Sequence, residues 1–266
     1  MKKTFFYAAA LLVSVSLSSC SKEETGGEAS LPTPTGNTKY LLKYRHNGGD
    51  SVLIAKYALS GNGLLLADTI YLSIEYMSSE VYPNAVREFT YGSKGLSSIT
   101  YKRYKADGSV DDTYDDYNYT DTYTYSGNTI SEKTSRGKWE YVYYMENGKI
   151  VRAVDLIDSD DESDKFYYNG NDCIKVESFK GARLVATQTN EFDDKKNPFY
   201  NNWFAFYDEA LGEHNLKKAT DTYPDGSSPY VDTNIEYLTY NGQDYPTKYE
   251  VVSYGTTVYS YEYIGW

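Results

Sequence analysis

The chain has 266 residues, of which 32 are tyrosine and 9 are phenylalanine, and its formal net charge is −12. Because affinity for nucleic acids depends on Lys and Arg side chains that neutralise phosphates, this charge argues against nucleic acid as a partner. Tyr and Thr favour the pleated, half-buried surface of a β-sheet. The composition therefore predicts an all-β protein.

The first residues have the features of a cleaved export signal. Lys2 and Lys3 precede the apolar segment Phe5–Leu17, which is shorter than the roughly 20 residues of a membrane-spanning helix. The sequence Leu17-Ser18-Ser19-Cys20 resembles a lipobox. We therefore expect residues 1–19 to be removed as a lipoprotein signal peptide and Cys20 to carry the lipid anchor, because several acyl chains on one residue give stable membrane binding. An ordinary secretory signal with an incidental cysteine is the alternative.

A flexible tether is expected at 20–37. Ser21-Lys22-Glu23-Glu24 resembles the short acidic export signal of surface lipoproteins from Bacteroidota-type bacteria. That resemblance implies an outer-membrane protein at the cell surface, with a periplasm-facing position as the alternative. Thr25–Asn37 consists mainly of Gly, Ser, Thr and Pro, a composition that cannot form a packed core.

Residues 38–266 are expected to form a single all-β domain. Aromatic residues alternate with others in Tyr123-Thr124-Tyr125, Tyr141-Val142-Tyr143 and Tyr259-Ser260-Tyr261-Glu262-Tyr263. In a strand, period two places such residues on one face.

A repeated unit runs along this domain from Phe89 onward. An aromatic pair is followed by a Gly or Asn turn and an aliphatic strand, and three of the turns contain Asn147-Gly148, Asn169-Gly170 and Asn241-Gly242. Asn-Gly between alternating runs is a strong signal for a type I′ hairpin. The 24-residue spacing from Tyr144 to Tyr168 fits one hairpin per repeat. We expect an antiparallel β-meander of about 10 to 14 strands, strongly curved or closed into a barrel because exposed edges are unfavourable.

A family resemblance rests on three segments. They are Glu191-Phe192-Asp193-Asp194-Lys195-Lys196-Asn197-Pro198-Phe199, Asn215-Leu216 and Tyr245-Pro246-Thr247-Lys248. Together they resemble a family of Bacteroidota lipoproteins of unknown function with a porin-like β fold. The resemblance implies a fold and a location but no catalytic residues. Tyr-rich repeats of this kind are also similar to the YD repeats of large secreted shells.

Binding is the function that the sequence favours. Tyr and Trp offer apolar faces with a polar edge, suited to sugars or protein partners. Trp139, Tyr200 and Trp203 lie in irregular segments and are the candidate ligand-binding residues. Most tyrosines at period-two positions are expected to pack the sheet instead. We expect a non-enzymatic binding or structural role with a glycan or protein ligand.

The sequence contains no catalytic motif that we recognise and implies no cofactor. His46 and His214 are isolated, and no Gly-x-Ser-x-Gly or phosphate-binding glycine loop is present. Cys173 is expected to be a buried small hydrophobe. The acidic run with Asp158, Asp160, Glu162 and Asp164 could gather Ca²⁺, but a solvated hairpin tip is the preferred interpretation.

Two other functions stay open. A carbohydrate-active hydrolase would need two carboxylates at a separation that sequence cannot measure. An outer-membrane β-barrel pore is suggested by the aromatic C-terminal strand that ends at Trp266. However, Ser260 and Glu262 between its tyrosines do not form the apolar outer band that a transmembrane barrel requires.

Overall fold

The computed structural model describes residues 33–47, 50–73, 81–112, 118–157, 161–202, 204, 211–252 and 256–266. The signal peptide 1–19, the lipidated Cys20 and most of the tether therefore lie outside the described residues. Within the described part, the chain is all β, with sixteen strands. The strands are β1 (Lys39–Asn47), β2 (Asp50–Leu59), β3 (Leu65–Ser73), β4 (Val81–Gly92), β5 (Gly95–Arg103), β6 (Tyr119–Ser126), β7 (Thr129–Thr134), β8 (Glu140–Glu146), β9 (Lys149–Asp155), β10 (Glu162–Asn169), β11 (Asp172–Lys180), β12 (Arg183–Lys196), β13 (His214–Thr222), β14 (Tyr230–Tyr240), β15 (Pro246–Val252) and β16 (Thr256–Ile264).

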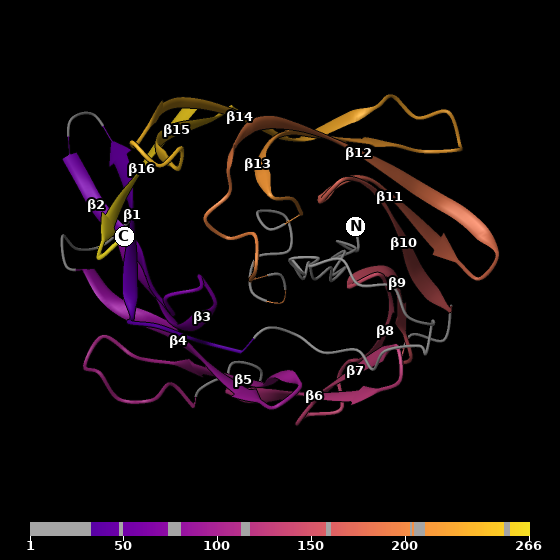
Figure 1. Ribbon diagram of the computed structural model, residues 1–266, viewed down its shortest axis with the longest axis horizontal. Helices are drawn as coiled ribbons and strands as arrows, with labels where there is room; N and C mark the ends of the chain where they lie inside the picture. The colour runs from indigo at the N-terminus through magenta and orange to yellow at the C-terminus, as the bar shows by residue number, and fades with distance from the viewer. Residues whose placement is uncertain are drawn as a thin grey trace, which may run out of the picture. The chain divides into compact units, whose positions relative to one another are not determined.

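The strands form an antiparallel meander that closes on itself. Each strand is hydrogen-bonded to its neighbours in sequence, and β1 also pairs with β16, so the sheet is a closed barrel (Figure 1). The predicted curved sheet or barrel is confirmed. The predicted number of strands was too low, because β1 to β3 precede the first recognisable repeat at Phe89. No helix in the described part of the chain has the length and apolar composition needed to cross a bilayer.

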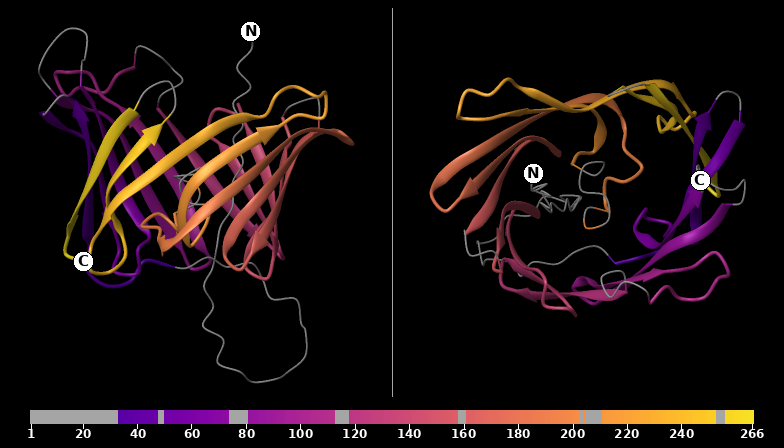
Figure 2. Two further views of the ribbon diagram at one scale, coloured as in Figure 1. Left: turned by 90° about the horizontal axis from the view of Figure 1, so that it is seen from above. Right: turned by 180° about the vertical axis from the view of Figure 1, so that it is seen from behind.

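The chain divides into two compact units, which we describe separately. The central unit contains Tyr125–Ser131 and Trp139–Asp232. The terminal unit contains Leu31–Thr124, Glu132–Lys138 and Thr233–Trp266. Within each unit, consecutive strands run side by side (Figure 2).

Each unit has a packed face that is mainly apolar and aromatic, as the alternating patterns predicted, with a smaller number of buried polar side chains. In β8, Tyr143 and Met145 are buried while Tyr144 between them is exposed. In the terminal unit, Leu41 and Ile99 are fully buried. Burial of one Leu or Ile side chain contributes roughly 1.5–3 kcal/mol to folding. The tyrosine-rich alternation therefore serves mainly to build the packed face.

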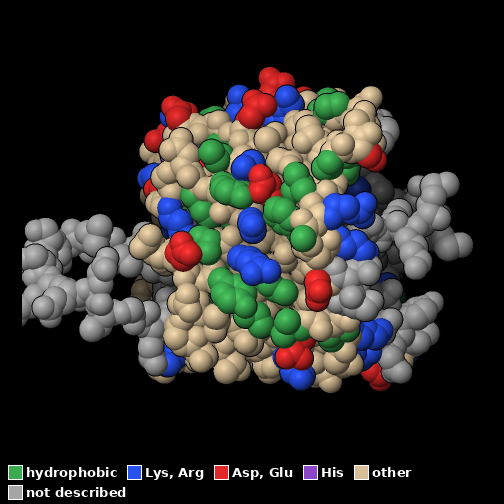
Figure 3. Space-filling model, turned by 90° about the vertical axis from the view of Figure 1, so that its right-hand side faces the viewer, with side chains coloured by type: hydrophobic (Ala, Val, Ile, Leu, Met, Phe, Trp, Pro, Cys, Tyr) green, Lys and Arg blue, Asp and Glu red, His purple; other side chains and the backbone are tan. Residues whose placement is uncertain are grey.

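The exposed face of the strands carries charged side chains among hydrophobic ones such as Ile174, which is 42% exposed. Cross-strand ion pairs join Lys102 to Glu88 at 3.2 Å and Lys218 to Glu191 at 3.3 Å, with the side chains 40–67% exposed. The surface seen from the side of β10 to β12 shows Lys, Arg, Asp and Glu interspersed with hydrophobic side chains (Figure 3). Exposed ion pairs add at most about 1 kcal/mol each. They place opposite charges side by side on this face.

Turn geometry confirms one Asn-Gly hairpin and corrects two others. Asn147 and Gly148 both have positive φ, 50° and 75°, as a type I′ turn requires. In the next predicted hairpin, Asn169 pairs with Asp172, so the turn residues are Gly170 and Asn171. The third predicted hairpin is a longer turn, closed by a hydrogen bond from Asn241 N to Tyr245 O at 2.9 Å. There the Asn241 side chain caps the turn by accepting from two backbone N–H groups.

Candidate ligand-binding face

The packed face of β15 and β16 in the terminal unit carries a cluster of tyrosine rings. The Tyr249 ring centroid lies 5.1 Å from that of Tyr259 and 5.4 Å from that of Tyr261, with interplanar angles of 22° and 26°. Alternation puts Tyr259 and Tyr261 on one face of β16, and Tyr249 pairs directly with Tyr259. Tyr249 and Tyr261 are buried, whereas Tyr259 is half-buried. The cluster thus has both packed and accessible rings.

The cluster continues to the C-terminal residue. The Trp266 ring lies 4.9 Å from Tyr245 and 5.0 Å from Tyr263, with interplanar angles of 73° and 87°. The Trp266 indole N–H donates to Tyr40 O at 3.2 Å, and Tyr263 OH donates to Pro246 O at 2.7 Å. Burial raises the pKa of both Tyr245 and Tyr263, so both hydroxyls keep their protons at neutral pH. We call the following residues the aromatic strip: Tyr245, Tyr249, Tyr259, Tyr261, Tyr263 and Trp266.

Two lysines of β1 lie over the aromatic strip. The Lys43 ammonium is 5.3 Å from the Tyr259 ring centroid and 5.7 Å from that of Tyr249. The Lys39 ammonium is 5.0 Å from the Trp266 ring. Cation–π contacts of this kind contribute about 0.5–2 kcal/mol each. The strip therefore combines flat apolar surface with positive charge.

A row of facing residues crosses the packed face from β16 to β6. Antiparallel register places each member directly opposite the next one, strand by strand. Neighbouring strands are about 4.8 Å apart, so seven strands span roughly 29 Å. We call this set the cross-sheet row: Tyr263, Leu41, Tyr57, Asp68, Arg87, Tyr101 and Tyr119. It connects the aromatic strip with a polar region of the same unit.

The polar part of the row is centred on a buried ion pair. Arg87 Nε donates to Asp68 Oδ2 at 2.9 Å, and the Arg87 NH2 group also binds this carboxylate. The Asp68 side chain is 0% exposed and that of Arg87 is 16% exposed. The neighbouring Tyr101 and Tyr119 rings stack at 4.2 Å. Burial raises the pKa of Tyr101 well above its usual value, although Arg87 opposes the shift. The row therefore offers a fixed guanidinium–carboxylate pair beside stacked rings.

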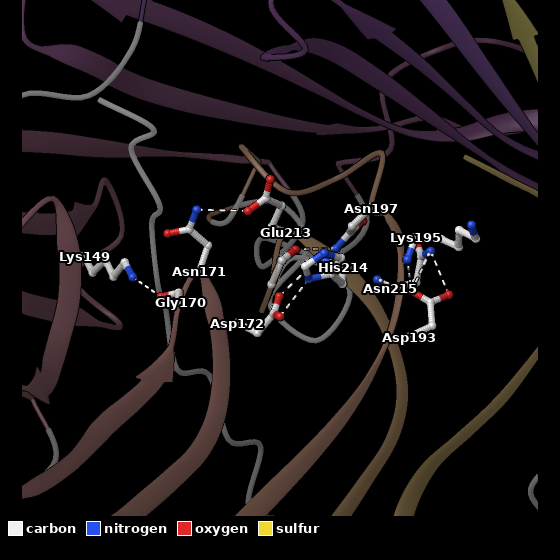
Figure 4. A network of polar contacts seen from close by, with 11 residues as sticks. Lys149, Gly170, Asn171, Asp172, Asp193, Lys195, Asn197, Glu213, His214 and Asn215 are labelled. Carbon is white, nitrogen blue, oxygen red and sulfur yellow. Dashed lines mark hydrogen bonds and ion pairs between the residues drawn. The ribbon is translucent and has the colours of Figure 1, made fainter. Parts of the chain in front are cut away.

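A second polar network lies in the central unit, where the β10–β11 turn meets the segment before β13 (Figure 4). His214 Nδ1 donates to Asp172 Oδ2 at 2.8 Å, and the His214 backbone N–H donates to Asp172 Oδ1 at 3.1 Å. Asn171 Nδ2 donates to Glu213 Oε2 at 3.0 Å. These bonds fasten the start of β13 to the hairpin turn.

The segment that carries the family resemblance belongs to the same network. Asp193 accepts hydrogen bonds from the backbone and side chain of Asn215 at 3.1–3.2 Å. Asn197 Nδ2 donates to Gly212 O at 3.0 Å, and Asn197 Oδ1 accepts from Phe199 N at 2.9 Å. Phe199 is 3% exposed. The residues of this motif thus hold the β12–β13 connection in place.

Tyr200 and His214 have electrostatically perturbed environments in this network. Burial raises the pKa of Tyr200, and the carboxylates of Glu213 and Asp172 raise it further. Its hydroxyl has no hydrogen-bond partner among the described residues. The pKa of His214 is raised chiefly by its hydrogen bond to Asp172. An Asp–His pair of this kind favours the charged imidazolium.

The predicted binding residues do not come together in the aromatic strip. Trp139 is half-buried just before β8, and Tyr200 lies in the β12–β13 connection, both within the central unit. Trp203 lies outside the described residues. The strip itself was visible in the sequence only as the alternating tyrosines of the last strand. No sequence pattern predicted that this face would include Lys43, Asp68 and Arg87, because their positions depend on strand register.

The two described members of the calcium candidate set lie on β10. Glu162 pairs with Lys180 at 3.5 Å. Burial raises the pKa of Asp164 to about 6, with a further contribution from Glu162, while a hydrogen bond with Ser178 opposes the shift. Asp158 and Asp160 lie outside the described residues. Within the described part, no three His, Cys, Asp or Glu side chains gather closely enough to hold a metal ion.

Comparison with known proteins finds similar solved structures but no similar sequence. No family model and no curated protein matches the chain. Among solved structures, the chain is similar to a porin-like protein from Bacteroides uniformis, with 13% sequence identity and a TM-score of 0.43. The match covers 88% of this chain and 100% of the other.

Proposed function

We propose that the protein is a lipid-anchored outer-membrane lipoprotein, displayed at the cell surface, whose barrel domain binds a glycan without enzymatic turnover. The observation that carries the proposal is the aromatic strip. Half-buried tyrosine and tryptophan rings offer the apolar faces on which sugar rings stack, and the tyrosine hydroxyls supply polar contacts. A protein partner is the other outcome that binding screens can reveal.

Charged side chains on the exposed face support anchoring at the membrane rather than insertion in it. A transmembrane barrel needs an apolar outer band, whereas Lys102, Glu88, Lys218 and Glu191 lie exposed on their strands. The lipobox resemblance at Cys20 supplies the anchor instead. A C20A variant should lose acyl labelling and appear in the soluble fraction. Ion conductance after reconstitution of the protein in planar bilayers would refute this part of the proposal.

Features of the candidate nucleophiles support a non-enzymatic role. Burial raises the pKa of the Cys173 thiol to about 12, which leaves almost no thiolate at neutral pH. His214 Nδ1 is engaged with Asp172, and among the residues that the structure describes no cysteine or serine hydroxyl is bonded to its ring. Turnover of a polysaccharide panel, abolished by substitution of a single carboxylate, would overturn this assignment.

Surface display is tested on intact cells. Protease added outside should remove the domain if it is displayed, and should leave it intact if it faces the periplasm.

The ligand class is tested with the mature protein purified in mild detergent and screened on a glycan array. We expect binding that the variant Y259A weakens about tenfold, the loss that accompanies roughly 1.4 kcal/mol. The matched control is Y44A, because Tyr44 on β1 pairs with Ser260 on the opposite face and its hydroxyl binds the exposed Glu262. Equal loss in both variants would refute a role for the strip.

A further inference from the structure

Buried hydrogen-bond acceptors surround the polar end of the cross-sheet row. Asp121 is 2% exposed, and Glu132, which is 9% exposed, accepts a hydrogen bond from the Tyr123 hydroxyl through Oε1 at 3.2 Å. Both carboxylates help to raise the pKa of the Tyr101 hydroxyl, which places them in the surroundings of that side chain. Asp121 also pairs with Ile99, next to Tyr101 along the packed face of β5. The carboxylates therefore share the packed face with the ion pair of Asp68 and Arg87.

Thr134 on β7 adds a buried hydroxyl to this cluster. Ser135 N donates to Thr120 O at 2.8 Å, so the preceding residue, Thr134, lies opposite Asp121. Period two places Thr134 on the same face as Glu132, and the exposed Lys133 between them points the other way.

The Thr134 hydroxyl is an unexplained polar group. Thr134 is 1% exposed, and its Oγ1 has no hydrogen-bond partner among the described residues. An unsatisfied buried hydroxyl costs about 1–3 kcal/mol. A ligand that forms the missing hydrogen bond would remove this cost.

We infer that this cluster, which we call the β5–β7 subsite, takes a neutral sugar residue of the glycan and selects it through its hydroxyl groups. The inference rests on the proposed function. Carboxylates accept hydrogen bonds but cannot donate them, whereas sugar hydroxyls donate. The stacked rings of Tyr101 and Tyr119 give the sugar an apolar surface. A uronic or sialic acid would instead bring its carboxylate near Asp121 and Glu132, where like charges repel.

The test measures affinity by calorimetry with the full mature protein. The neutral probes are maltohexaose, cellohexaose and mannohexaose, and the acidic probes are hexagalacturonate and a sialylated oligosaccharide. We expect the wild type to bind a neutral probe at least about tenfold more tightly than either acidic probe. T134V should weaken neutral binding about tenfold without lowering the melting temperature, because the lost hydroxyl makes no internal bond. E132Q should narrow the gap between neutral and acidic probes.

The control and the outcomes separate this inference from the proposed function. T124V makes the same chemical change on the exposed face of β6 and should leave affinity unchanged. If no glycan binds, the proposed function itself fails. If a glycan binds and Y259A weakens it, while T134V binds like the wild type and acidic probes bind equally well, the subsite is refuted and the proposed function stands.

Discussion

The buried Asp68–Arg87 pair makes a quantitative prediction about stability. Breaking such a pair by removing one partner costs about 3–5 kcal/mol, because the remaining charge stays buried and unpaired. The Asp68 side chain is 0% exposed, and two Arg87 nitrogens bind it. Asparagine keeps one carbonyl acceptor, so D68N should fall near the lower limit, at about 3 kcal/mol, and R87L should cost at least as much.

A double-mutant cycle tests this reasoning. The double variant D68N/R87L should cost only about 1 kcal/mol, because no buried charge remains, so the coupling energy should be about 5 kcal/mol. Urea denaturation followed by circular dichroism measures each free energy of unfolding. The control is E88Q, which breaks the exposed Lys102–Glu88 pair and should cost less than about 0.5 kcal/mol. A D68N cost below about 1 kcal/mol, or single-mutant effects that simply add, would refute the argument.

Three further predictions concern turns and pH. G170A should lower the free energy of unfolding by about 1 kcal/mol, because Gly170 has a φ of +57°. The control is G242A, which should be neutral in the same denaturation assay. Gly242 does not have a positive φ, and nothing lies within 4 Å of a Cβ added there. The pKa of His214 is raised in the fold, so its pair with Asp172 stabilises the protein fully below about pH 6.5 and loses this effect as pH rises through the raised pKa. The difference in free energy of unfolding between wild type and H214N should therefore shrink over that pH range. A difference that stays constant with pH would contradict this prediction. The pKa of Asp164 is raised to about 6, so its ionisation destabilises the fold as pH rises from about 4 to 6. D164N should therefore be more stable than wild type by up to about 3 kcal/mol near pH 7.5 and equally stable near pH 4.

Local patterns in the sequence predicted the fold because a meander needs only local information. Alternation in Tyr141-Val142-Tyr143 identifies a strand and its packed face, and Asn147-Gly148 fixes a turn without reference to distant residues. Closure between β1 and β16 followed from the general need to cover edges. The observed turn differs from the predicted one where a side chain caps the loop, as the Asn241 side chain does.

The candidate site was less predictable because it depends on strand register. Asp68 and Arg87 are 19 positions apart in sequence and meet only because β3 pairs with β4 in one register. A shift of β4 by one residue would send the Arg87 side chain to the opposite face, away from Asp68. Lys43 reaches the tyrosines of β16 across the closure of the sheet. Sequence reasoning identified the aromatic members of the site but not the charges beside them.

The buried Cys173 gives the barrel an internal reporter of its own opening. Its side chain is 0% exposed, and burial raises the pKa of the thiol to about 12. Alkylation needs an accessible thiolate, so the labelling rate of Cys173 measures how often the strand pairing around β11 opens. Added glycan that binds the native protein should slow this labelling only if ligand binding and opening of the central unit are coupled. One cysteine can thus reveal whether the two units communicate.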